Sequence, residues 1–269
     1  MRNLLKSFLS GLDKSQMQQR PKAQLNLEAL EDRTVPSGTG INGFNDDREF
    51  FDEPDPNLLS TGNIQSDFIR NLYLTELGRD ASPAEVNVWL PILTSGGPAA
   101  VANGIDASPE AIGRRINTFF VEFLGRPAAA GDIAALTPLL TAGTITEESV
   151  LAGILGSNEF FAVANREFGT TNDFSSFIRG LYQFALDRGA SDGEVRLYQM
   201  VGQTQSRTTI AAIFVTSVEF RSGATDEFYN VFLDRGADNG EQKLWANTPL
   251  TIQQVRVNIA SSNEFFLQQ

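Results

Sequence analysis

The 269-residue chain contains no cysteine and no histidine. The missing side chains exclude thiolate nucleophiles, histidine-based catalytic triads, zinc sites of the usual ligand sets and haem ligation by histidine. A metal ion would have to be bound by oxygen ligands, as calcium and magnesium are. We therefore expect no cofactor, and calcium binding is the alternative.

Positive charge is also scarce. Four lysines and 17 arginines stand against 33 acidic residues, and the formal net charge is −12. Phosphate binding needs a basic face, so nucleic acid is not expected as a partner. No apolar run approaches the ~20 residues that span a bilayer, and no transmembrane segment is expected. A hydrophobic fraction of 41% in a chain of this length does predict a globular body.

The first 63 residues differ from the rest of the chain. Residues 1–24 carry five basic side chains and one acid, whereas residues 38–63 are rich in acids, glycine and proline. The acidic stretch has the composition of a solvated linker. We predict a disordered N-terminal arm over residues 1–63.

Between these two stretches lies the segment Leu25–Ser37, "LNLEALEDRTVPS". It resembles an N-terminal motif of many planctomycete proteins, Leu-Glu-x-Leu-Glu-Asp-Arg followed by Pro-Ser, which also follows a basic stretch. Those proteins are thought to be exported or surface-associated. The resemblance implies a sorting role and an exported, cell-surface or extracellular location, and an ordinary amphipathic segment is the alternative.

A recurring arginine organises the rest of the sequence. It follows an apolar segment four times, with separations of 47, 62 and 47 residues, at Arg79, Arg126, Arg188 and Arg235. Such self-similarity indicates structural repeats. Each apolar segment has hydrophobic residues every three or four positions, which predicts a helix.

The segments after each arginine also correspond. A second helix ends near an apolar anchor (Trp89, Leu136, Tyr198 or Trp245), and a third runs to a closing motif that begins with serine. No segment shows sustained strand-like alternation. We predict an all-α fold of about twelve helices, in four three-helix repeats. The repeats form two pairs, residues 64–165 and 166–269.

Two acidic loops, "LDRGASDGE" from Leu186 and "LDRGADNGE" from Leu233, allow two interpretations. The first is a helix start, because Ser191 or Asp238 followed three residues later by glutamate forms a capping box. Ser82 and Glu85 fit the same pattern. The second is a calcium site, although the spacing is not that of an EF-hand loop. Its ligands would be Asp187, Asp192, Asp234 and Asp238.

The repeated arginines are expected to pair with the glutamates of the closing motifs. These glutamates follow the arginines by 29 to 33 residues and are Glu110, Glu159, Glu219 and Glu264. A charge-assisted pair of this kind would tie the two ends of each repeat together. The alternative is a row of guanidinium groups that face an anionic ligand.

The stretch "FIRNLYLTELGRDASPAEVNVWLPIL" and the Ser-x-Glu-Phe closings resemble the bacterial domain of unknown function 4214. Leu77-Gly78-Arg79 and Trp89 match its pattern, whereas the third repeat departs with Asp187-Arg188-Gly189 and Tyr198. The resemblance covers residues 66–269. It implies an all-helical fold like the linker domains of phycobilisomes, in exported bacterial proteins that often carry calcium-binding repeats or adhesive modules. It implies no activity and no catalytic residues.

These observations favour a non-enzymatic exported or cell-envelope protein that acts as an interaction or scaffolding module. Its partner would be an unknown protein or polysaccharide of the envelope. The phenylalanines of the closing motifs would be either contact residues or core, and they are Phe160, Phe161, Phe265 and Phe266. A calcium-binding structural module is one alternative. A glycoside hydrolase that uses two facing carboxylates is the other.

Overall fold

The computed structural model describes the backbone of residues 56–169 and 173–269, and side chains from residue 64 onward. Within these ranges the chain forms helices and no strand, which confirms the all-α prediction. The sorting-like motif and most of the expected N-terminal arm lie outside the described residues. Helix α3 begins at Pro56, so residues 56–63, assigned to the arm from the sequence, are helical.

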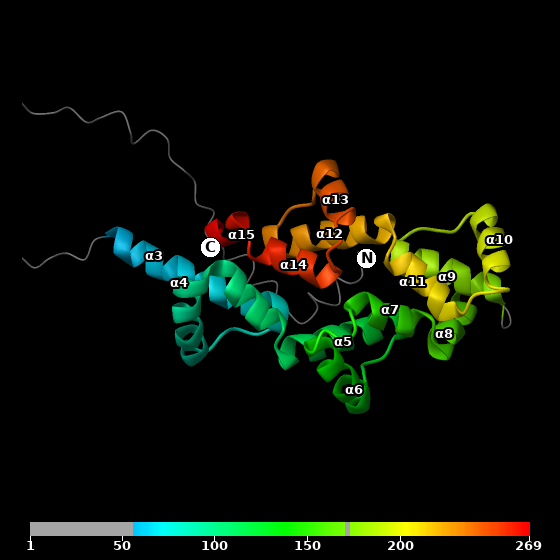
Figure 1. Cartoon of the computed structure of the whole chain (residues 1–269), viewed down its shortest axis with the longest axis horizontal. Coiled ribbons are helices and arrows are strands. Elements are labelled where there is room, and N and C mark those ends of the chain that lie inside the picture. Colours follow the sequence, from blue (N-terminus) through cyan, green and yellow to red (C-terminus); the bar gives the residue numbers. More distant parts are fainter. Residues whose placement is uncertain (1–55, 170–172) are drawn as a thin grey trace, which may run out of the picture.

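The helices follow one another through short connections (Figure 1). The first, α3 (Pro56–Leu72), continues into the π-helical turn η2 (Tyr73–Leu77). The others are α4 (Pro83–Asp106), α5 (Pro109–Leu124), α6 (Ala130–Thr141), α7 (Glu147–Leu155), α8 (Asn158–Phe168), α9 (Phe174–Leu186), α10 (Asp192–Val201), α11 (Arg207–Val215), α12 (Val218–Leu233), α13 (Asn239–Ala246), α14 (Ile252–Ala260) and α15 (Asn263–Leu267).

Polar side chains fix where the helices begin. The Ser191 hydroxyl accepts a hydrogen bond from the backbone N–H of Glu194, whose carboxylate accepts from the Ser191 backbone. The same reciprocal capping box begins α4 at Ser82 and α13 at Asp238. Such a cap typically contributes about 1 kcal/mol. At the start of α6 the capping position is Ala129, which has no side-chain oxygen to accept a hydrogen bond. Only the Ala129 backbone N–H takes part, by donating to the Asp132 carboxylate.

Helix α4 combines two of the predicted helices. Gly97 has φ 72° and ψ −179°, and Pro98 follows it, so the helix breaks there. Only glycine adopts this backbone conformation readily, because a side chain would clash with the neighbouring carbonyl. The loop expected between the two helices is therefore reduced to a break at one residue, Gly97.

The buried apolar side chains form two cores. The first joins α5, α7, α8, α9 and α11 and includes Phe160, Phe177 and Phe220. The second joins α3, α4, α14 and α15 and includes Phe68, Phe232 and Phe265. Helix α12 contributes Phe220 to one core and Phe232 to the other.

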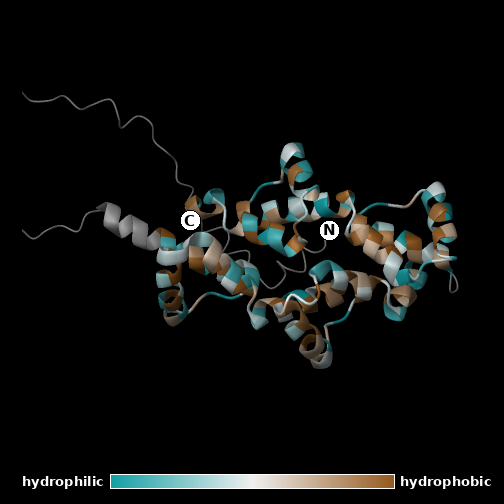
Figure 2. Cartoon of the chain, in the orientation of Figure 1, coloured by the Kyte–Doolittle hydropathy of each residue, from teal (hydrophilic) through white to brown (hydrophobic). Residues whose placement is uncertain are grey.

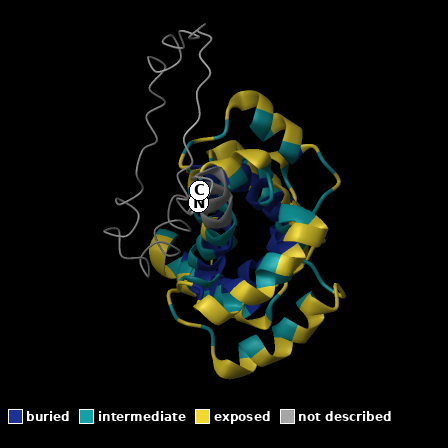
Figure 3. Cartoon of the chain, turned by 90° about the vertical axis from the view of Figure 1, so that its left-hand side faces the viewer, coloured by how far each residue is buried: buried dark blue, intermediate teal, exposed yellow. Residues whose placement is uncertain are grey.

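This arrangement differs from the order of the sequence. Residues of the predicted first and fourth repeats share one core. The other core consists mainly of residues from the predicted second and third repeats, with Ile252 from the fourth. Each core thus contains residues from both sides of position 165, and the pairing of the repeats as residues 64–165 and 166–269 stays a prediction. The buried residues face a common interior in the view along the long axis (Figure 3).

The closing phenylalanines belong to these cores. Phe160 and Phe265 have no exposed surface. The Phe161 ring packs against Phe177 at 6.1 Å between centroids, and the Phe266 ring against Phe68 at 5.1 Å. Phe160 and Phe265 are therefore core residues, whereas Phe161 and Phe266 are half-buried at the edges of the cores.

Apolar and polar residues mix along the helices, as Figure 2 shows. No helix among the described residues has both the length and the apolar character that crossing a bilayer requires.

Candidate functional site

Each repeated arginine lies in the same set of contacts, which we call an arginine clamp. Arg79 donates to Glu110 through Nε at 2.6 Å and Nη2 at 2.8 Å. It also donates to both carboxylate oxygens of Glu85, the capping-box residue of α4. Its guanidinium lies 5.1 Å from the centre of the Tyr73 ring. The Tyr73 hydroxyl in turn accepts a hydrogen bond from Trp89 Nε1 at 2.8 Å.

The three other clamps repeat this geometry. Arg126 donates to Glu159, Arg188 to Glu219 and Arg235 to Glu264, each through two nitrogen atoms. Each guanidinium also stacks over an aromatic ring, and these rings are Phe120, Tyr182 and Tyr229. Trp245 donates to the Tyr229 hydroxyl at 3.2 Å, as Trp89 does to Tyr73. The pairing expected from the sequence spacing is present in all four places.

The clamps hold their carboxylates ionised. The side-chain hydrogen bond from Arg188, with the backbone and hydroxyl of Ser191, lowers the pKa of Glu194 to about 2. Arg235 does the same for Glu241, whose pKa is also about 2. Every clamp guanidinium is thus engaged by carboxylates and an aromatic ring. This occupancy favours the structural interpretation over a row of guanidinium groups open to an anion.

The four aspartates proposed as calcium ligands have separate places. Asp187 and Asp234 end α9 and α12 in the left-handed conformation, with φ 54° and 53°. Aspartate tolerates this conformation better than most residues do. Asp192 pairs with Arg179 at 3.1 Å, and Asp238 caps α13. No group of three or more potential metal ligands lies together among the described residues.

The structure also contains a buried ionic network whose members were not among the residues predicted from the sequence. It consists of Glu76 from η2, Asp106 from α4, Arg115 from α5, Glu147 from α7 and Arg256 from α14. None of these residues has more than 6% of its surface exposed. The network joins segments that lie up to 180 residues apart in the sequence.

The two arginines bridge the three carboxylates. Arg256 donates to both oxygens of Glu147, at 2.8 and 2.9 Å, and to Asp106 Oδ1 at 2.6 Å. Arg115 binds Glu76, Asp106 and Glu147 at 3.2, 3.3 and 2.9 Å. Gln253 completes the shell by donating to Asp106 Oδ2 at 2.7 Å. Buried charges of this kind persist only when they are paired in this way.

Burial and pairing act in opposite directions on these groups. Burial alone would raise the pKa of Glu147, but the charges and hydrogen bonds of Arg256 and Arg115 outweigh it and lower the pKa to about 2. Burial raises the pKa of Glu76, despite the attraction of Arg256. Glu147 is therefore the firmly ionised centre of the network.

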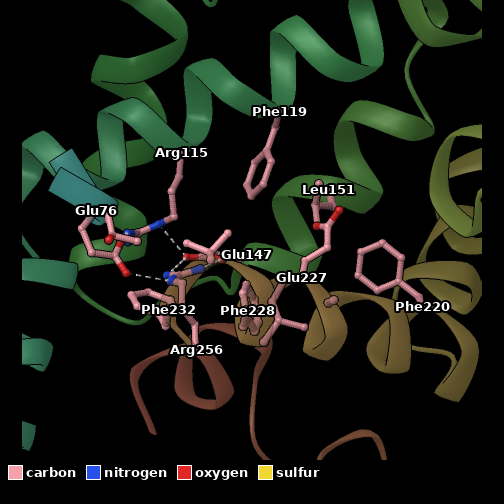
Figure 4. Close-up of a pocket in the computed structure, with 14 residues that line it drawn as sticks. Glu76, Arg115, Phe119, Glu147, Leu151, Phe220, Glu227, Phe228, Phe232 and Arg256 are labelled. Atoms are coloured by element: carbon pink, nitrogen blue, oxygen red, sulfur yellow. Dashed lines mark hydrogen bonds and ion pairs between the residues drawn. The ribbon is translucent and has the colours of Figure 1, made fainter. Parts of the chain in front are cut away.

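A pocket with a cavity of about 70 Å³ adjoins the network. Glu76, Arg115, Glu147 and Arg256 line one side of it (Figure 4). The rest of the lining is mainly apolar and includes four phenylalanines. These are Phe119, Phe220, Phe228 and Phe232.

Glu227 enters this pocket from α12, between Phe119 and Phe220 in Figure 4. It is 9% exposed, and its Oε1 has no hydrogen-bond partner among the described residues. Burial raises its pKa to about 9, and the nearby Glu122, Asp226 and Asp187 add to the effect. Burial likewise raises the pKa of Glu122 to about 8.

The sequence did carry a signal for these groups. Arg115 lies three residues after Ile112 and four before Phe119, which is the apolar face of its helix. Glu76 lies four residues after Leu72, and Arg256 four after Ile252, again on apolar faces. A charge at a core position predicts a buried partner. The pattern cannot say which partner, because the partners are distant in the sequence.

Comparison with known proteins identifies one part of the chain. Residues 57–115 match the family described as Domain of unknown function (DUF4214). No curated protein and no solved structure matches the chain. The matched region contains Arg79, Glu85, Trp89 and Glu110, so the first arginine clamp lies inside the part of the chain that is similar to this family.

Proposed function

We propose that this chain is a non-enzymatic interaction or scaffolding module built of four three-helix repeats. The repeat organisation is supported by the four arginine clamps, in each of which the arginine pairs with the glutamate of the closing motif. Stacked helical units typically bury a continuous core and offer an extended outer surface to partners. The repeated arginines and glutamates pair with one another and in this way hold the units together.

The observation that carries the proposal is a recurring exposed apolar side chain. Val88, Leu197 and Leu244 each precede the aromatic anchor of their unit by one residue. They are 63%, 51% and 64% exposed. The second unit has the small Ala135 there and exposes Leu139 instead, at 41%.

These side chains lie on helices at the outside of the molecule. Helices α4, α6, α10 and α13 project at its periphery in Figure 1. Single exposed apolar residues are ordinary. Their recurrence at corresponding positions of projecting helices is the feature that we assign to contact with a partner. The partner would be a protein or polysaccharide of the cell envelope. The resemblance of Leu25–Ser37 to the sorting segment is what supports an exported location.

The two alternatives lack a specific observation in their favour. Glycoside hydrolysis needs two carboxylates flanking a sugar. The cavity of about 70 Å³ is smaller than the ~150 Å³ that holds one benzene ring. A calcium-binding module would need the acidic loops to gather several carboxylates, whereas Asp187 ends α9 and Asp238 begins α13.

Site-specific photo-crosslinking tests the proposal in the full chain. A photoreactive residue replaces Leu197 or Leu244 in the native cell, and the control position is the exposed Glu167 on α8. We expect both helix positions to capture the same envelope component, and expect Leu197→Asp to reduce capture at position 244. If the two positions give no more product than Glu167, the proposed surface is wrong.

A further inference from the structure

The pocket beside the ionic network has an unusual combination of linings. Four phenylalanine side chains line it together with Glu227, whose carboxyl group lies apart from the paired carboxylates of Glu76 and Glu147. Glu227 is more than nine-tenths buried, and its Oε1 has no partner among the described residues. A buried polar atom without a partner is costly to a fold and calls for an explanation.

The repeat pattern does not require this acid. Arg126 and Arg235 are 109 residues apart, and the same spacing relates Phe119 to Phe228 and Thr118 to Glu227. The Thr118 hydroxyl has a hydrogen-bond partner in its own helix, because it donates to the carbonyl oxygen of Arg114 at 3.0 Å. Glu227 therefore departs from its counterpart at the point where α12 faces the pocket.

The surrounding groups favour a cationic occupant. Arg115 and Arg256 are both engaged by network carboxylates, which leaves them unsuited to an anion and unable to pair with an ionised Glu227. Apart from burial, the described groups that raise the pKa of Glu227 are themselves acids, namely Glu122, Asp226 and Asp187.

The lining distinguishes an organic cation from a metal ion. Calcium and magnesium need six or more oxygen ligands, and the described residues contain no group of three potential ligands. Aromatic rings instead attract cations that carry alkyl groups, and a carboxylate beside them completes such a site. The cavity of about 70 Å³ has room for roughly two to three water-sized groups.

We propose that this pocket binds a short alkylammonium ion, with the ammonium group against the Glu227 carboxylate and the alkyl group among the phenylalanines. Glu227 must be ionised to make this pair. Because burial raises its pKa to about 9, binding displaces a proton at neutral pH. The affinity consequently rises with pH, by about tenfold per unit between about pH 6 and 8.

The test uses ethylammonium chloride and the full chain, followed by the NMR signals of the Leu151 and Ile252 methyl groups that line the pocket. We expect saturable shifts with a dissociation constant in the millimolar range at pH 8, on the order that a ligand of so few atoms can reach. Ethanol has the same alkyl group without the charge. It should produce shifts at least tenfold weaker.

Two variants complete the experiment. Glu227→Gln keeps the shape, removes the charge and is expected to abolish ethylammonium binding. Glu167→Gln, on the exposed face of α8, should leave it unchanged. The proposal is overturned if ethanol binds as well as ethylammonium, if Glu227→Gln retains binding, or if the methyl signals do not respond. In the last case the cavity holds only water.

Discussion

The arginine clamps and the buried network use the same side chains in opposite surroundings. Arg188 in its clamp is 40% exposed and its partner Glu219 is 46% exposed. In the network only 7% of the Arg256 side chain and 2% of the Glu147 side chain are exposed. Water competes for the clamp charges, so each pair contributes little and can be replaced. In the network the protein alone compensates the charges, so every member depends on the others.

The largest expected effect comes from opening the network. Arg256→Met leaves Glu147 and Asp106 without their main partner, and we expect the free energy of unfolding to fall by about 3–5 kcal/mol. Urea denaturation at pH 7 measures the change. Arg166→Met, which alters an exposed arginine on α8, is the matched control and should shift stability by less than about 0.5 kcal/mol. Equal effects in the two variants would contradict the role assigned to the network.

A smaller effect with the opposite sign is expected at the unpaired carboxyl of Glu227. Its pKa is about 9 in the folded chain against an ordinary value of 4.5. Because the folded pKa is raised, this acid is least harmful below pH 4.5 and costs progressively more stability as the pH rises toward 9. Glu227→Gln should therefore stabilise the protein by roughly 1–3 kcal/mol at pH 7 and by little at pH 4.

Thermal unfolding of both proteins from pH 4 to 8 gives the comparison. The difference in stability between Glu227→Gln and the parent should widen steadily with pH. A difference that does not change with pH would mean that Glu227 is ionised in the folded chain.

The smallest effect is expected in a clamp. A double-mutant cycle of Arg188→Gln and Glu219→Gln should give a coupling energy of about 0.5–1 kcal/mol, because both groups are partly exposed. Reversing both charges is a weaker test, since the new acid at position 188 would face Glu194. The coupling should shrink in 1 M salt. A coupling within about 0.3 kcal/mol of zero would show that the pair adds nothing.

The same contrast explains what the sequence could predict. Arg79 and Glu110 recur with a nearly constant spacing, so their pairing could be inferred from four copies of one pattern. The capping boxes at Ser82, Ser191 and Asp238 depend on residues three apart and were equally accessible. Because both features are local or repeated, one sequence is enough to predict them.

The rest depended on how the segments pack. Glu76 and Arg256 meet only because α3, α4 and α14 share a core, and no spacing in the sequence encodes that choice. The packing of Phe161 against Phe177, a residue of the following helix α9, likewise could not be read from the spacing. Charges on apolar helix faces marked the network residues without naming their partners.

The sharing of one core by the two ends of the described chain has a consequence during synthesis. Phe68 rests against Phe265, which leaves the ribosome about 200 residues later. At the usual rate of translation that interval is ~10–40 s. During that time the buried face of α3 and α4 lacks the residues of α14 and α15 that cover it in the folded chain. Most residues of the other core lie on α5 to α11, which are synthesised earlier and can pack first. A chaperone that binds this protein during synthesis would therefore find exposed apolar surface on α3 and α4.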